Sequence, residues 1–84
     1  MKTDYRDVIN PDAPERFRGN PFAKQAIGGW VASVVVECRK SDIQRFSRIE
    51  CEAALAMPDL QRTLIPVIRR RLREIYEMER RGVA

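Results

Sequence analysis

The clearest pattern of apolar and polar positions lies in the last third of the chain. Apolar residues recur there at the spacing of a helix with one buried face: Leu60, Leu64, Val67, Ile68, Leu72, Ile75 and Tyr76. Pro66 falls inside this pattern, and proline lacks an amide proton and clashes with the preceding helical turn. We therefore favour a short turn at 59–65 followed by a helix that begins near Ile65, over a single kinked helix. Gly82 is a suitable stop signal for this helix.

A second helix is predicted between about residues 41 and 57. Ser41 can cap its N-terminus, and Asp42 would lie in the first turn, where negative charge suits the helix dipole. The apolar positions keep the helical spacing over four turns: Ile43, Phe46, Ile49, Ala53 and Ala56. Pro58 ends the helix, because the residue before a proline avoids helical backbone angles.

The segment from 20 to 38 allows two interpretations. Asn20-Pro21 can start a helix, and a helical stripe of apolar residues follows it: Ile27, Trp30, Val31, Val34, Val35 and Cys38. However, residues 30–36 are rich in β-branched side chains, and Gly28 and Gly29 would each cost a helix interior about 1 kcal/mol relative to alanine. We favour the helix and keep a strand at about 30–38 as the alternative.

The fold class that these patterns predict is all-α, a small three-helix bundle. Prolines in the first part of the chain exclude a continuous helix there, so we expect an irregular arm at 1–22 that packs on the bundle. The whole chain, 1–84, forms one domain, with its helical core at 23–82. A strand at 30–38 would make the fold α+β instead. The predicted core consists of Ile27, Trp30, Val31, Val34, Val35, Ile43, Phe46, Ile49, Ala53, Leu64, Ile68, Leu72 and Ile75.

Charge and composition restrict the function classes. The 84 residues carry a formal net charge of +4. Most of this excess lies in residues 58–84, which hold seven basic and four acidic side chains. This is a mild preference for an acidic partner rather than the strongly basic composition of a typical DNA-binding domain. The longest uncharged run, 25–36, is too short to cross a bilayer, and no secretion signal follows Met1. Two cysteines are too few for a disulfide framework, so we predict a cytoplasmic protein.

The sequence offers no catalytic, metal-binding or cofactor-binding site. Histidine, the commonest general base and metal ligand, does not occur in the chain. Cys38 and Cys51 alone cannot complete a four-ligand zinc site, and we expect both to be small buried apolar residues. Gly28-Gly29 lacks the lysine and the spacing of a phosphate-binding loop. We therefore predict that the protein is not an enzyme and needs no cofactor.

The candidate binding residues form two groups. The first, the arginine cluster, consists of Arg69, Arg70, Arg71 and Arg73. Its guanidinium groups can bind phosphate or a partner's carboxylates, or they can form a solvated helix face paired with Glu74 and Glu77. The second group is Gly28, Gly29 and Trp30. Small residues allow close approach of another backbone, and tryptophan is enriched in binding hot spots.

The function that we favour is a protein-binding module, a small adaptor or inhibitor that occupies a surface of a larger protein. Small accessory proteins of bacteria and phages often have this profile. One alternative is a nucleic-acid-binding regulator that uses the arginine cluster, although Pro66 would distort the recognition helix of a helix-turn-helix motif. Another alternative is a homo-oligomeric assembly component that associates through the first predicted helix. No membrane partner is expected.

Overall fold

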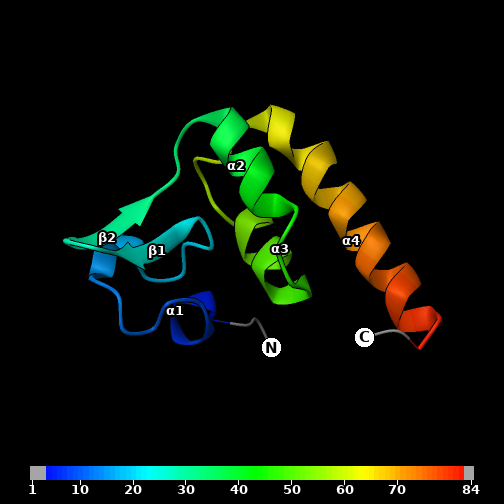
Figure 1. Ribbon diagram of the computed structural model, residues 1–84, viewed down its shortest axis with the longest axis horizontal. Coiled ribbons are helices and arrows are strands. Elements are labelled where there is room, and N and C mark those ends of the chain that lie inside the picture. The colour runs from blue at the N-terminus through cyan, green and yellow to red at the C-terminus, as the bar shows by residue number, and fades with distance from the viewer. Residues whose placement is uncertain (1–3, 83–84) are drawn as a thin grey trace.

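The computed structural model describes residues 4–82 of the chain (Figure 1). Its helices and strands are α1 (Tyr5–Val8), β1 (Ala23–Ala26), β2 (Gly29–Ala32), α2 (Val36–Ile43), α3 (Arg48–Leu55) and α4 (Ile65–Arg80), with short 3-10 turns η1 (Glu15–Phe17) and η2 (Arg62–Leu64). The fold is 53% helical and 10% strand. The prediction of an all-α bundle is therefore wrong, and the α+β alternative fits.

A β-hairpin stands where the first helix was predicted. β1 and β2 pair antiparallel with Ala26 opposite Gly29, so that Ile27 and Gly28 form a two-residue turn. The backbone φ angles of Gly28 and Gly29 are 94° and 130°. A right-handed helix excludes such angles, whereas glycine adopts them without steric cost. The alternative strand at 30–38 is correct only at its beginning, because β2 ends at Ala32.

Two helices, α2 and α3, replace the single helix predicted between 41 and 57. α3 begins with a capping box, in which the Ser47 hydroxyl accepts from the Glu50 N–H at 3.5 Å and the Glu50 carboxylate accepts from the Ser47 N–H at 2.9 Å. Ser41, the expected cap, lies inside α2. The helical spacing of apolar residues therefore continues across the non-helical connection between α2 and α3.

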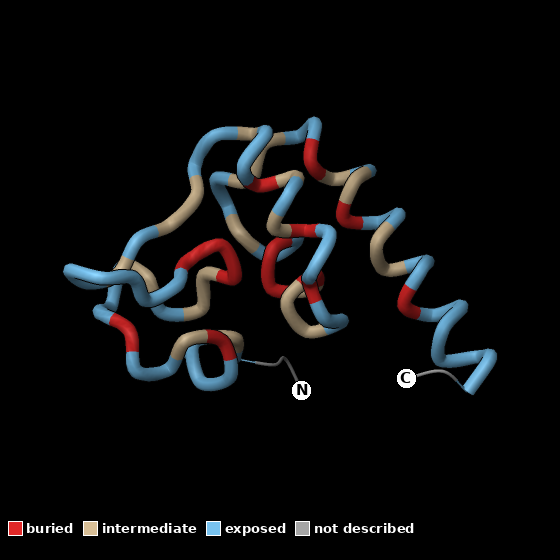
Figure 2. Tube along the Cα trace, viewed as in Figure 1, coloured by how far each residue is buried: buried red, intermediate tan, exposed pale blue. Residues whose placement is uncertain are grey.

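The predicted start of the last helix is confirmed. η2 precedes α4, and Pro66 lies in the first turn of α4, where a missing amide proton breaks no helical hydrogen bond. Arg81 caps the C-terminus of α4, and Gly82 follows with a φ angle of 74°. Beyond Ile75, every described residue of α4 is exposed, and this end of the helix projects from the rest of the molecule (Figures 1 and 2).

The core lies where α2, α3 and the first half of α4 meet, together with Phe22 from the segment before β1 (Figure 2). Six predicted core residues are buried: Ile43, Phe46, Ala53, Leu64, Ile68 and Ile75. Three more are half-buried: Trp30, Ile49 and Leu72. The prediction is wrong for the four exposed residues Ile27, Val31, Val34 and Val35. We call these four side chains the aliphatic strip; Ile27 and Val31 lie on the hairpin, and Val34 and Val35 lie in the connection from β2 to α2.

Candidate functional site

The exposed side of α4 carries a row of arginines. Arg69 and Arg73 lie four positions apart and Arg80 seven further on, so all three share one side of the helix. They span about 16 Å along the helix axis. We call this row the arginine face. Within residues 4–82, none of the three forms an ion pair with a carboxylate. Arg70 is also exposed and unpaired in this range, on the flank of the row.

Arg71 differs from the other members of the arginine cluster. Its Nε donates to the Phe46 carbonyl at 3.0 Å, and its Nη1 lies 3.6 Å from a Glu74 carboxylate oxygen. Only 22% of its side chain is exposed. Arg71 therefore fastens α4 to the segment before α3, and three of the four clustered arginines remain free to meet a partner.

Exposed apolar and aromatic groups lie on the projecting part of α4, beyond Ile75. Tyr76 shares the side of the arginine face, whereas Met78 lies on the opposite side of the helix. Tyr76 and Met78 are both partly exposed, and the Arg48 guanidinium lies 5.0 Å from the centre of the Tyr76 ring. Arg48 also pairs with Glu79 at 3.9 Å, so this contact links α3 to α4. An apolar hollow of about 240 Å³ lies beside it, between Phe46 and Met78. Arginine, tyrosine and methionine are the side chains enriched at protein interfaces.

The second predicted group, Gly28, Gly29 and Trp30, lies on the hairpin. A Cβ atom added to Gly28 or Gly29 would meet nothing within 4 Å. These glycines therefore serve the turn and do not pack against another part of the fold. Trp30 is half-buried on β2. The sequence interpretation missed the aliphatic strip here, because it assigned those side chains to the core.

A buried arginine also escaped the sequence interpretation. Arg39 is 3% exposed, its Nε donates to the Ser33 carbonyl at 2.7 Å, and its guanidinium lies 4.5 Å from the centre of the Phe22 ring. These contacts connect α2 to the end of the hairpin. Arg39 is therefore part of the fold, and its buried charge is not available to a ligand.

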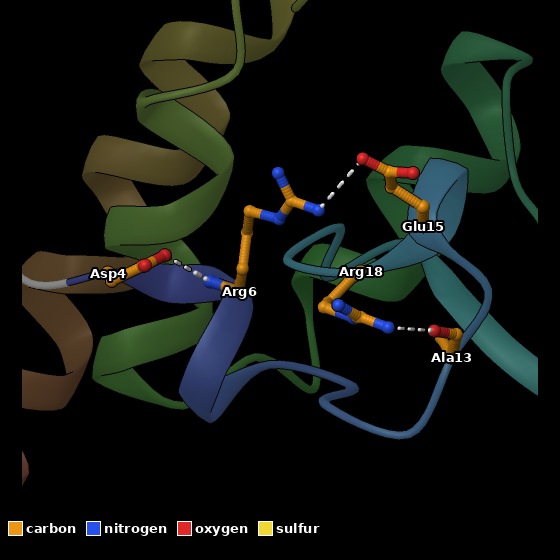
Figure 3. Close-up of polar contacts among 5 residues, drawn as sticks. All are labelled: Asp4, Arg6, Ala13, Glu15 and Arg18. Atoms are coloured by element: carbon orange, nitrogen blue, oxygen red, sulfur yellow. Dashed lines mark hydrogen bonds and ion pairs between the residues drawn. The ribbon is translucent and has the colours of Figure 1, made fainter.

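A hollow of about 480 Å³ lies between the N-terminal arm and the end of α3. Two of the arginines that line it, Arg6 and Arg18, are engaged within the arm (Figure 3). Arg6 pairs with Glu15 at 3.4 Å, and Arg18 donates to the Ala13 carbonyl at 3.3 Å. Carboxylates of Asp4 and Asp59 line the same hollow and oppose an anionic ligand. The hollow is therefore not a convincing ligand site.

The two cysteines lie in different environments. Cys51 is fully buried, and burial raises the pKa of its thiol from 9.0 to about 11. Cys38 is exposed on α2, so the expectation of a buried residue is correct for Cys51 and wrong for Cys38. Among residues 4–82, no three His, Cys, Asp or Glu side chains are grouped to hold a metal ion.

Two further features bear on the class of protein. The connection from Leu55 to Ile65 is much longer than the three- or four-residue turn of a helix-turn-helix motif. Within the described part of the chain, no helix has the length and apolarity needed to traverse a lipid bilayer. Compared with known proteins, the chain matches no family model, no curated protein and no solved structure.

Proposed function

We propose that the chain is a non-enzymatic protein-binding module whose arginine face docks on an acidic surface of a larger protein, as an adaptor or an inhibitor. The observation that carries this proposal is the lack of carboxylate partners for the arginine face within residues 4–82. Two arginines that hold the fold do have such partners, in the pairs Arg6–Glu15 and Arg71–Glu74, whereas the buried Arg39 donates to neutral oxygens instead. The guanidinium fork binds a carboxylate through two parallel hydrogen bonds.

The surroundings of the arginine face favour a protein as the partner. Every basic side chain beyond Lys40 is an arginine, and lysine is the basic residue that protein interfaces avoid. Tyr76, seven positions beyond Arg69, adds exposed aromatic area on the same side of α4. A cytoplasmic location suits the proposal, because both cysteines are free thiols and the cytoplasm keeps thiols reduced.

A nucleic-acid-binding regulator is the second candidate function. The observation in its favour is the placement of three guanidinium groups in one row on the exposed side of α4, without carboxylate partners within residues 4–82, where they can contact phosphates. Three phosphate contacts would make the logarithm of the binding constant fall with that of the salt concentration, with a slope of about −2.7 on duplex DNA. Binding to duplex DNA without that salt dependence, or no binding, would remove this candidate.

Affinity capture from the native host tests the proposal with matched variants. The variant Arg69→Glu/Arg73→Glu reverses the charge at two positions of the arginine face. The control variant Lys24→Glu/Arg45→Glu makes the same change of net charge at exposed residues elsewhere. After nuclease treatment, we expect the wild type and the Lys24/Arg45 variant to retain the same protein in an equimolar amount. The arginine-face variant should lose it.

Two outcomes would contradict the protein-binding proposal. If all three forms retain the same proteins equally, the arginine face does not bind the partner. If nuclease treatment releases every specific partner from the wild type, nucleic acid is the primary ligand and the second candidate function is favoured.

A further inference from the structure

The arginine face is part of a longer strip of side chains on α4. Arg69, Arg73, Tyr76 and Arg80 follow one another at steps of four, three and four residues, so they share one side of the helix. All four are exposed. Steps of three and four residues are those with which one helix contacts another along its length. We call these four residues the arginine–tyrosine strip.

The arginine–tyrosine strip lies apart from the side of α4 that is buried in the fold. That side carries Ile68 and Ile75, which belong to the core with α2 and α3. The nearest part of α3 is Arg48, whose guanidinium lies 5.0 Å from the centre of the Tyr76 ring, at one edge of the strip. The end of α4 projects from the molecule (Figure 1). A partner can therefore lie along the strip without displacing a helix of this fold.

The charges of the strip are all positive. Two of the three carboxylates of α4, those of Glu74 and Glu79, pair with arginines outside the strip at 3.6 Å and 3.9 Å. The third acidic residue, Glu77, lies on the flank that also carries Arg70, seven positions before it. The complement of the strip is therefore a surface with three carboxylates in a row, the second about 6 Å and the third about 16 Å beyond the first.

This spacing selects the secondary structure of the complement. A second α-helix has the same rise and repeat as α4, so carboxylates four and eleven residues beyond the first share one face and match all three arginines. A β-strand rises about 3.3 Å per residue, so it would need carboxylates two and five residues beyond the first. Those two residues point to opposite faces of a strand. A strand therefore meets two of the arginines but not the third.

We infer that the partner presents an acidic α-helix, which lies along α4 and pairs its carboxylates with Arg69, Arg73 and Arg80. The inference rests on the proposed function, and it names the element of the partner that the arginine face binds. Each guanidinium fork can donate two parallel hydrogen bonds to one carboxylate. An apolar side chain of the partner helix lies opposite Tyr76 and covers the exposed part of its ring.

Titration of the labelled chain with stapled helical peptides, followed by NMR, tests the helix. Two row peptides of alanine, glutamate and leucine place three glutamates and one leucine opposite the strip, one peptide for a parallel and one for an antiparallel helix. The control peptide has the same composition, but its glutamates are five residues apart and so lie on three sides of the helix. At low ionic strength, one row peptide should shift the arginine Nε–H signals of the strip and bind about tenfold more tightly than the control. Equal binding of all three peptides, or none, would overturn the inference.

A charge swap tests the pairing of individual positions. Arg69→Glu/Arg73→Glu should no longer bind the row peptide, and should bind it again when the two opposed glutamates of the peptide are replaced by arginine. Lys24→Glu/Arg45→Glu should bind the original peptide as the wild type does. Circular dichroism checks that each variant is folded, and Arg69→Gln/Arg73→Gln, which removes the two charges without reversing them, should bind the original peptide more weakly than the wild type. Failure of the swapped peptide to restore binding to a folded variant would overturn the pairing.

Failure of this inference can be distinguished from failure of the proposed function. If the row peptides bind no better than the control while affinity capture still depends on Arg69 and Arg73, the arginine face binds a protein through another kind of surface. If the capture does not depend on these arginines, the proposed function fails and the inference fails with it. Duplex DNA that binds the strip more tightly than the row peptides at physiological salt would overturn the inference in favour of nucleic acid.

Discussion

Arg39 and Gln61 are joined by a 2.7 Å hydrogen bond, from the guanidinium Nη1 to the side-chain carbonyl. The same pair holds the chain where it leaves the hairpin, because Arg39 donates to the Ser33 carbonyl at 2.7 Å and Gln61 Nε2 donates to the Val34 carbonyl at 2.8 Å. Within residues 4–82, no carboxylate pairs with this buried arginine. Neutral oxygens and the ring of Phe22 stabilise its charge instead.

Arg39→Lys should lower the free energy of unfolding by about 1–3 kcal/mol, because an ammonium group cannot reproduce the planar fork that reaches both acceptors. Urea denaturation measures the loss. A double-mutant cycle with Gln61→Ala should show a coupling of about 0.5 kcal/mol or more between the two side chains. Strictly additive effects would mean that the observed hydrogen bond contributes nothing to stability.

We expect Arg71 and the arginine face to differ in their effect on folding stability. Arg71→Ala leaves the Phe46 carbonyl without its partner and should cost about 1–2 kcal/mol of folding free energy. Arg69→Ala removes the same kind of side chain from the exposed face and should change stability by less than about 0.5 kcal/mol. Thermal and urea unfolding of the two variants distinguish the roles; equal losses would contradict the assignment of Arg71 to the fold.

The positive φ angle of Gly28 in the hairpin turn should make stability sensitive to substitution there. Gly28→Ala should destabilise the protein by about 1 kcal/mol, since an L residue is strained at a φ angle of 94° although space for its Cβ is open. A chemically synthesised chain with D-alanine at the same position fits this angle, and should be as stable as the wild type or more so. If both forms lost stability equally, contacts of the added methyl group rather than backbone strain would be the cause.

Cys51 should make stability depend on pH in the alkaline range. Its raised pKa of about 11 means that the folded state favours the neutral thiol. The buried thiol therefore makes its full contribution to the unfolding free energy below about pH 9, and this contribution is lost as the pH rises toward 11. The difference in unfolding free energy between the wild type and Cys51→Ala, measured from pH 7 to pH 11, isolates this contribution from other titrating groups. A difference independent of pH would contradict the burial effect.

Thiol labelling gives an independent measurement of the same environments. At about pH 8, iodoacetamide should modify the exposed Cys38 of the folded chain and leave Cys51 unmodified, because only the thiolate reacts. In a denaturant both thiols should react at similar rates. Rapid labelling of Cys51 under native conditions would show that the core opens easily.

The last helix could be predicted from sequence because its signals are local. The apolar spacing, Pro66 in the first turn and Gly82 after the end all indicate the same helix. The capping box at Ser47 and Glu50 was also readable, since its spacing is a known helix start, but the continuous apolar pattern from Ile43 onward obscured it.

The hairpin could not be assigned in the same way, because aliphatic residues at 27–35 match the spacing of a helix as well as that of a strand. The angles that Gly28 and Gly29 adopt decide between the two. For the candidate site, sequence locates the arginine cluster but cannot separate Arg71 from its neighbours. That separation depends on the Phe46 carbonyl, which belongs to a distant part of the chain.

The hydrogen bond from Asn10 to Ala23 ties the N-terminal arm to the hairpin. The same amide donates to the Asn20 carbonyl at 2.9 Å, so one side chain occupies two backbone acceptors. An unpaired strand edge is a template on which another chain can pair and aggregate. The arm thus protects part of β1 from pairing with other molecules, and loss of the Asn10 amide would expose it.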